Sequence, residues 1–243
     1  MKRNINPYKD SNLDKKEQVA QMFNNISGNY DSLNRVISLG LDTSWRKNVL
    51  NLVANTKPNN ILDIATGTGD LAILMSQTSA QKIIGLDISA GMLEVGRKKV
   101  TEKNLDHKIE LVLGDSENIP YPDNHFDAIT VSYGIRNFED LEKGLAEILR
   151  VLKPNGIFVI LETSVPTNFP FKQGYNLYTN TFLPLVGKLF SKDKVAYSYL
   201  SESAQNFPYG EALLSILKTV GFVNAKALPQ TFGVATIYTS TKN

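Results

Sequence analysis

The sequence of 243 residues contains no cysteine. This absence excludes disulfide bonds, catalysis by a thiolate, and zinc or iron–sulfur sites held by cysteine. Histidine is almost as scarce, because only His107 and His125 occur, and both lie in polar turn or loop sequence. We therefore predict no metal site, and neither histidine stands out as a general base.

Strong charge asymmetry and long apolar runs are also missing. The formal net charge is +2, and apart from the triplet Arg97–Lys99 at the end of a predicted helix there is no basic run that would indicate nucleic-acid binding. No apolar stretch approaches the ~20 residues that span a bilayer. The basic start lacks the apolar core of a signal peptide. We expect a cytoplasmic protein without a nucleic-acid partner, and peripheral contact with the inner face of the membrane stays open.

Short apolar runs alternate with amphipathic helices along most of the chain. The predicted strands cover 61–64, 82–87, 109–113, 126–132, 157–161, 222–227 and 234–239. The main predicted helices cover 45–53, 70–77, 92–103, 141–152 and 211–220. This order predicts an α/β fold with a seven-stranded, mostly parallel sheet and helices on both faces. The last two strands are too close for a crossover helix, so the final strand should be antiparallel.

A glycine-rich turn directly follows the first predicted strand. Gly67, Thr68 and Gly69 stand between that strand and a helix, where glycines let the backbone approach a ligand closely. Asp87 ends the next strand 18 positions after Gly69, which is the spacing of a carboxylate that binds an adenosine ribose. With Ala72, the same spacing also matches a GxGxxA dinucleotide motif. The turn therefore predicts an adenosine ribose and leaves NAD open as an alternative cofactor.

Further polar residues follow the strands on the same edge. Asp63 lies inside the first strand, where it could orient the turn or bind the amino group of a methionine moiety. Asp115 and Ser116 follow the third strand, where they could contact an adenine amino group. Each also has a simpler interpretation. Asp63 could only cap a loop, Asp87 could be an ordinary turn residue, Asp115 could form a local Asx turn, and Ser132 could be hydrogen-bonded within the core.

Together with the antiparallel final strand, these features are the general pattern of Rossmann-like class I methyltransferases. A closer resemblance rests on motifs that extend from about Val19 to the C-terminus. The motifs are Tyr30-Asp31-x-x-Asn34-Arg35, the stretch 62–70, Asp87-Ile88-Ser89, the run 126–137, Arg150–Pro154 and Tyr197-x-Tyr199-Leu200. The chain resembles the C-methyltransferases of menaquinone and ubiquinone synthesis. The groups Gly134-Ile135-Arg136-Asn137 and Tyr197-x-Tyr199-Leu200 are the most specific.

The resemblance implies a cofactor, a reaction and a set of site residues. The cofactor is S-adenosylmethionine, and its contacts fall on Thr68, Asp87, Asp115, Ser116 and Ser132. The reaction is methylation of a ring carbon of a demethylmenaquinol or a related prenylated benzoquinol. The substrate pocket takes in Tyr30, Tyr133, Tyr178, Tyr197 and Tyr199. This sequence departs from the family pattern at Tyr133 and Thr163, where phenylalanine is usual, and at Asn155-Gly156, where Gly-Gly is usual.

The proposed chemistry needs an electron-rich ring. A phenolic hydroxyl has a pKa of roughly 10, so the site should stabilise the oxyanion of the quinol. We expect Arg136 to donate charge-assisted hydrogen bonds to that oxygen and Asn137 to orient the ring. The alternative is that Arg136 pairs with a structural carboxylate such as Asp140 or Glu139.

The predicted organisation is a single methyltransferase domain, 1–243. It comprises an N-terminal helical segment 1–57, a core 58–165 that binds S-adenosylmethionine, an aromatic helical cap 166–208, and a final helix with two strands, 209–243. The cap aromatics, with Tyr175, Phe182, Leu183 and Phe190 among them, could form a channel for an isoprenoid tail or only the core of the cap.

Alternatives outside this reaction stay open. They are methylation of another small aromatic or lipid acceptor, an NAD-dependent oxidoreductase, and a non-catalytic protein that binds an adenosyl ligand or a lipid. Whether the chain is a monomer or a homodimer is also open.

Overall fold

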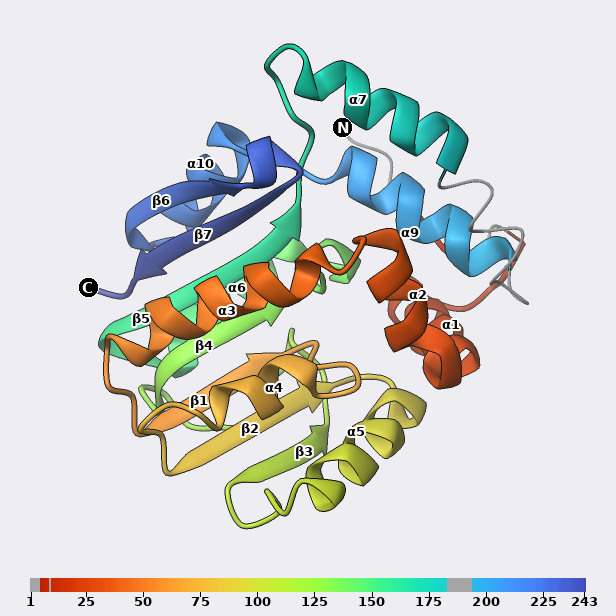
Figure 1. Cartoon of the computed structure of the whole chain (residues 1–243). Helices are drawn as coiled ribbons and strands as arrows, with labels where there is room; N and C mark the ends of the chain where they lie inside the picture. Colours follow the sequence, from red (N-terminus) through yellow and green to blue (C-terminus); the bar gives the residue numbers. More distant parts are fainter. Residues whose placement is uncertain (1–4, 9, 183–193) are drawn as a thin grey trace.

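The computed structural model describes residues 5–8, 10–182 and 194–243. Within them, seven strands form one sheet in the order β3-β2-β1-β4-β5-β7-β6 (Figure 1). The strands are β1 Asn60–Ile64, β2 Lys82–Asp87, β3 Ile109–Leu113, β4 Phe126–Ser132, β5 Leu152–Thr163, β6 Val223–Gln230 and β7 Ala235–Thr241. The predicted number of strands is confirmed.

Strands β1 to β5 pair in parallel, whereas β7 is antiparallel to both β5 and β6. The short turn η4, Thr231–Gly233, joins β6 to β7 and leaves no room for a crossover helix. The antiparallel final strand is therefore confirmed. Strand β5 begins at Leu152 rather than at Ile157, because Leu152 already pairs with Phe126 before a register shift in β4.

Helices cover both faces of the sheet, as predicted. On one face, α6 Leu141–Val151 and α10 Glu211–Val220 bury leucine and isoleucine side chains against β1, β4 and β5. On the other face lie α3 Leu41–Ala54, α4 Asp70–Met75 and α5 Ala90–Glu102. Helix α4 ends at Met75, two residues earlier than predicted. Ser76 and Gln77 instead make the short i→i−3 bonds that close a helix end.

The remaining helices lie over the carboxyl ends of the parallel strands (Figure 1). They are α1 Lys15–Ile26, η1 Ser27–Asn29, α2 Tyr30–Ile37, α7 Phe171–Leu177, η3 Tyr178–Phe182 and α9 Lys194–Asn206. The apolar stripe of α1 packs against α9, since Val19 and Met22 are buried with Ala196 and Tyr199. This packing places α1 above the edge of the sheet at which β1, β2 and β4 end.

A capping box begins helix α1. Asp14 and Glu17 form a capping box, with the Asp14 backbone N–H 3.4 Å from Glu17 Oε2. No helix among the described residues has the length and apolar character needed to cross a membrane.

Candidate active site

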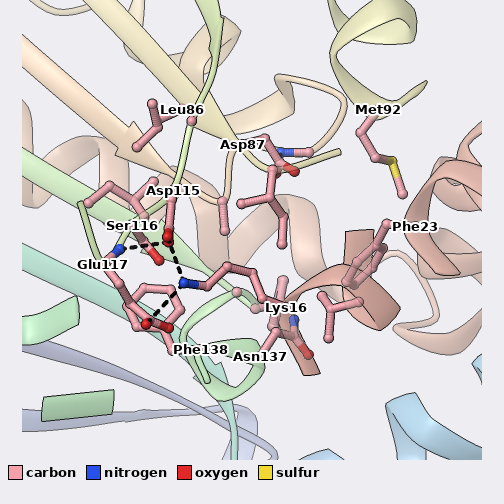
Figure 2. Close-up of a pocket in the computed structure, with 18 of the residues that line it drawn as sticks. Lys16, Phe23, Leu86, Asp87, Met92, Asp115, Ser116, Glu117, Asn137 and Phe138 are labelled. Carbon is pink, nitrogen blue, oxygen red and sulfur yellow. Dashed lines mark hydrogen bonds and ion pairs between the residues drawn. The ribbon is translucent and has the colours of Figure 1, made fainter. Parts of the chain in front are cut away.

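A cavity opens at the carboxyl ends of β1 to β4, beneath α1 and α2. It holds about 650 Å³ of empty space, part of it open to solvent. Its walls come from Lys16, Val19, Phe23, Tyr30, Ile64, Ala65, Gly67, Leu86, Asp87, Ile88, Met92, 114–117, 132–134 and 137–139. Figure 2 shows acidic and apolar side chains directed into the same space.

The glycine turn after β1 forms one wall of the cavity. Ala65, Gly67 and Gly69 all have positive φ, at 51°, 57° and 78°. Positive φ values cost little conformational free energy only in glycine, which explains why two of these three residues are glycines. The Gly67 N–H donates to Asp87 Oδ2 at 2.7 Å, so the turn is fixed to the end of β2.

Asp63 lies behind this turn and holds it in place. It is 1% exposed, and its two carboxylate oxygens each accept a hydroxyl hydrogen bond of 2.6 Å, from Thr66 and from Thr130. Burial raises its pKa to about 6. Asp63 does not line the cavity. The structure thus gives it the loop-holding role, one of the two interpretations of the sequence.

Asp87 lines the cavity and keeps acceptor capacity free. Its Oδ1 accepts from the Ser89 N–H at 2.8 Å, and its Oδ2 accepts from Gly67. A carboxylate offers about four lone-pair sites, so acceptor capacity remains for a ligand. Burial raises the pKa of Asp87, and backbone hydrogen bonds from Ser89, Gly67 and Ile88 oppose that rise.

The acidic end of the cavity is closed by the first turn of α1. Figure 2 shows Lys16 Nζ between Asp115 Oδ2, at 2.6 Å, and Glu117 Oε2, at 3.2 Å. Asp115 also accepts from the Glu117 N–H at 2.9 Å, which is the Asx turn that the sequence left open. Asp115 and Ser116 nevertheless both line the cavity.

Two residues at the end of β4 point unpaired polar atoms into buried space. Ser132 Oγ and the Tyr133 hydroxyl are buried without a hydrogen-bond partner among the described residues, and both residues line the cavity. The alternative that Ser132 is satisfied within the core is therefore wrong. Tyr133 also has a φ of +57°, an uncommon conformation for a bulky side chain, and strain of this kind clusters at functional sites.

Thr68 and Gly69, which the sequence placed at the cofactor, do not line the cavity. Thr68 donates to Asp31 Oδ1 at 2.6 Å and accepts from Lys99 Nζ at 3.0 Å. Lys99 in turn pairs with Asp31 at 2.5 Å and with Asp70 at 2.7 Å. This cluster ties α2 to the glycine turn and to α5, so Thr68 acts on the shape of the turn.

Arg136 and Asn137 lie in the short helix η2, Ile135–Asn137, after β4. Asn137 lines the cavity, whereas Arg136 does not. Arg136 is paired with a carboxylate, but the partner is Glu162 at the end of β5, at 2.6 Å. The predicted partners are wrong because both are used elsewhere: Glu139 accepts from the Lys15 N–H at 3.1 Å, and Asp140 caps α6 through the Lys143 N–H at 3.0 Å.

Glu162 is a residue to which the sequence assigned no role. Its side chain is 1% exposed, and that of Arg136 is 8% exposed. Burial opposes the charge of Arg136, but the neighbouring Glu162 keeps the pKa of Arg136 raised. The positive charge of Arg136 is also felt at Tyr30 and Tyr199, where it lowers each pKa against a larger effect of burial.

The predicted substrate tyrosines fall into three groups. Tyr30 and Tyr133 line the cavity. Tyr199 is buried near it, and its hydroxyl donates to Asn137 Oδ1 at 3.1 Å. Tyr178 instead donates to the Ile37 carbonyl oxygen of α2, away from the cavity walls. The side chain of Tyr197 lies outside the described part of the structure, as do the side chain of Phe182 and the whole of Leu183 and Phe190.

Sequence reasoning missed the contribution of α1. Lys15 Nζ donates to the Phe138 carbonyl oxygen at 2.6 Å, beside the Lys16 contacts to Asp115 and Glu117. The amphipathic stripe of α1 predicted a packed helix but gave no indication of what its first turn contacts. Glu117 Oε1 accepts from the backbone N–H groups of Glu139 and Asp140. The sequence showed only that Glu117 belongs to the acidic turn after β3 and did not indicate these contacts.

Comparison with known proteins identifies the family. Residues 11–242 match the sequence model of the ubiE/COQ5 methyltransferase family. The chain belongs to this family. It is 48% identical to a demethylmenaquinone methyltransferase of Bacteroides fragilis over 98% of this chain and 97% of that protein. It is 42% identical to the ubiquinone/menaquinone biosynthesis C-methyltransferase UbiE of Geobacter sulfurreducens over 94% of this chain and 90% of that protein.

Solved structures agree on the fold. A SAM-dependent methyltransferase from Aquifex aeolicus has a TM-score of 0.59 at 18% identity, with 82% of this chain and 89% of that chain covered. As a member of the ubiE/COQ5 family, the chain is a methyltransferase that uses S-adenosylmethionine, as the sequence predicted. The oxidoreductase alternative, which rested on glycine spacing alone, is set aside.

Proposed function

We propose that the chain methylates a ring carbon of a demethylmenaquinol to give menaquinol. The names of its relatives support this acceptor, since both refer to menaquinone synthesis. The observation that carries the proposal is the joining of two sites at one sheet edge. The cavity lined by Asp87 and Asp115, which we assign to the ribose and the adenine, also reaches Asn137, next to the buried cation Arg136.

The residues of the cavity fit S-adenosylmethionine. Asp87 has free acceptor sites for ribose hydroxyls, and Asp115 with Ser116 would accept from and donate to the adenine edge. Ser132 Oγ is a buried polar atom that still needs a partner. The space beside Gly67 is open, because a Cβ at this position would meet only Tyr30 Cε1, at 4.0 Å. A ligand could therefore approach the backbone here. Asp63, Thr68 and Gly69 would shape this wall from behind.

When bound, S-adenosylmethionine supplies an electrophilic methyl group on a sulfonium. The protein then has to position the acceptor ring and keep it electron-rich. Arg136 would stabilise negative charge on the quinol oxygen through its remaining N–H donors, in surroundings where water is largely excluded. Asn137, held by the Tyr199 hydroxyl, would orient the ring.

The ring would lie among Tyr30 and Tyr133, which are half-buried wall residues, and the buried Tyr199. We further propose that, of the predicted segment 1–57, only α1, η1 and α2 join the described helices of 166–208 as a helical cover, whereas α3 packs on the sheet with the core of 58–165 and 209–243. Tyr178, and Tyr197 by sequence, belong to this cover on the substrate side. The contact between Tyr178 and the Ile37 carbonyl oxygen joins the two parts of the cover.

Exposed apolar side chains on this cover and on the neighbouring turn η4 support contact with the membrane that contains prenylated quinols. They are Phe169, 80%, Phe232, 68%, Leu177, 66%, and Leu39, 65%. Two contacts link the segments that carry them: Phe171 stacks on Phe232 with ring centroids 3.8 Å apart, and Tyr178 donates to the Ile37 carbonyl oxygen. The sequence has no acidic residue in 35–41, 166–182 or 226–234, whereas it places Arg35, Lys172 and Lys226 there. We therefore infer peripheral binding to the anionic inner face of the cytoplasmic membrane.

The decisive experiment is a methyl-transfer assay. We expect turnover with a short-chain demethylmenaquinol under reducing conditions, and calorimetric binding of S-adenosylmethionine but not of NAD. Arg136→Lys should reduce kcat while the Kd of the cofactor stays within a factor of about 3, because Arg136 does not line the cavity. Normal cofactor binding without transfer to any quinol would refute the acceptor. Wild-type turnover by Arg136→Lys would refute its role.

Membrane binding is tested separately by sedimentation with vesicles that contain anionic lipid. The pair Phe169→Ser with Phe232→Ser should abolish sedimentation, whereas Leu13→Ser, which changes an exposed leucine at the start of α1, should not. Equal sedimentation of the two variants would exclude this surface.

A further inference from the structure

The buried ion pair between Arg136 and Glu162 is only half satisfied. Glu162 Oε1 is fully used, since it accepts from Arg136 NH1 at 2.6 Å and from the Thr163 N–H at 2.8 Å. Glu162 Oε2 is buried and has no hydrogen-bond partner among the described residues. The same is true of Arg136 Nε, which is a donor.

An unpaired donor and an unpaired acceptor in one buried ion pair define the missing ligand. Buried polar atoms in proteins are nearly always paired, and charged ones cost most when left alone. A hydroxyl group can donate to Oε2 and accept from Nε at the same time, whereas a carbonyl oxygen or an ether oxygen can only accept. The pair therefore has the hydrogen-bonding pattern of a site for a hydroxyl.

The position of the pair places it on the acceptor side of the site. Arg136 is followed directly by Asn137, which lines the cavity and binds the hydroxyl of Tyr199. Tyr30, another wall residue, lies within the electrostatic reach of Arg136. Glu162 follows Leu161, whose carbonyl oxygen accepts from the Tyr133 N–H at 2.8 Å at the end of β4. Neither Arg136 nor Glu162 lines the cavity itself, so the pair lies directly behind the wall to which Tyr133 and Asn137 contribute.

We propose that Arg136 and Glu162 together recognise a hydroxyl of the acceptor ring, so that the site selects the reduced quinol over the oxidised quinone. Glu162 is then a specificity-determining residue for the redox state of the substrate. This inference rests on the proposed function, because it assumes that a quinol is the acceptor. A quinone would satisfy Arg136 but would leave Glu162 Oε2 unpaired against its carbonyl oxygen.

The test is a binding measurement on the cofactor-free protein, without oxygen. The probes are a singly prenylated 1,4-naphthoquinone, its dithionite-reduced quinol, and the monomethyl ether of that quinol. Each Kd is measured by quenching of the intrinsic fluorescence of the protein. Wild-type protein should bind the quinol at least about 10-fold more tightly than the quinone, because one buried acceptor stays unpaired with the latter. The monomethyl ether should bind more weakly than the quinol when its methylated oxygen is the one next to Glu162, because that oxygen has no hydrogen to donate.

Glu162→Gln sharpens the test by exchanging one atom. The donors Arg136 NH1 and the Thr163 N–H fix the amide oxygen at the position of Oε1, so the amide nitrogen replaces Oε2. The site then offers two donors, which suits a carbonyl oxygen. The preference for quinol should fall at least about 10-fold or reverse. Glu142→Gln, an exposed substitution in α6, is the matched control and should keep the wild-type ratio.

Three results would overturn the proposal. One is equal affinity of the wild-type protein for quinol and quinone, which would mean that the pair holds only a water molecule. The second is an unchanged ratio in a Glu162→Gln protein whose circular dichroism and melting curve show that it is folded. The third is a wild-type protein that methylates no quinol, which refutes the proposed function as well. If the wild-type protein is active but the ratio does not respond to Glu162, only the role of Glu162 fails.

Discussion

Replacing Asp63 by asparagine should remove a defined part of the pH dependence of stability. Burial raises the pKa of Asp63 from its ordinary value near 3.8 to about 6. The folded protein therefore keeps this proton to a higher pH than the unfolded chain does. Because the folded state binds more protons between about pH 4 and pH 6, its stability falls as the pH rises through that window.

The magnitude follows from the same two values. A pKa that rises from 3.8 to about 6, at about 1.4 kcal/mol per pH unit, corresponds to a loss of about 3 kcal/mol. This contribution is fully present below about pH 4 and absent above about pH 6. Asparagine has the same shape and no charge, and the hydroxyls of Thr66 and Thr130 can accept from its amide group as well as donate to its oxygen.

The effect is measured by urea unfolding of the wild-type protein and of Asp63→Asn at pH 4, 5, 6 and 7, with circular dichroism as the readout. The stability of Asp63→Asn relative to wild type should increase by about 3 kcal/mol between pH 4 and pH 7. The Kd for S-adenosylmethionine should change by less than about 3-fold, since Asp63 lies behind the cavity wall. A stability difference that does not vary with pH would refute the argument from burial. A large loss of cofactor affinity would mean that Asp63 binds the cofactor directly.

Three further substitutions test the packing around the site. Gly134→Ala should destabilise the protein by about 1–3 kcal/mol in urea unfolding, because the new Cβ would lie 2.3 Å from Ala65 Cβ. Lys99→Met removes a half-buried cation that binds Asp31, so we expect a stability loss under about 1 kcal/mol and weaker cofactor binding, both measured at low and high salt. Leu145→Ala should cost about 2–5 kcal/mol in the same unfolding assay without changing the Kd of the cofactor, because Leu145 is fully buried on the α6 face.

The number of strands and the parallel core follow from local pattern, whereas the order of the strands comes from the tertiary structure. Each strand is a short apolar run, and each helix between strands carries an apolar stripe, so the alternation leaves few ways to bury both. The antiparallel final strand also follows locally, from a connection too short for a helix. Element ends were less certain: β5 starts five residues before Ile157, and α4 stops before Gln77. Such ends depend on pairing and capping partners that the sequence does not identify.

The meeting of these residues at one cavity could be predicted because strand ends meet at one edge. Gly67, Asp87, Asp115 and Ser132 each follow or end a parallel strand, and all four line the same cavity. Thr68 shows the limit of this reasoning. It belongs to the same turn, but its side chain turns toward Lys99 and Asp31, which come from two helices.

By itself the sequence determined at which edge of the sheet the cavity lies, because the periodicity of strands and the position of glycine are local properties. Tertiary structure decided the partners of the charged groups. Arg136 pairs with Glu162, 26 positions away, and Lys16 with Asp115, 99 positions away. Several carboxylates lie near each of these cations in the sequence. Only the packing of β4 against β5, and of α1 over the cavity, determines which carboxylate each cation contacts. The chemistry of the acceptor side depends on that selection.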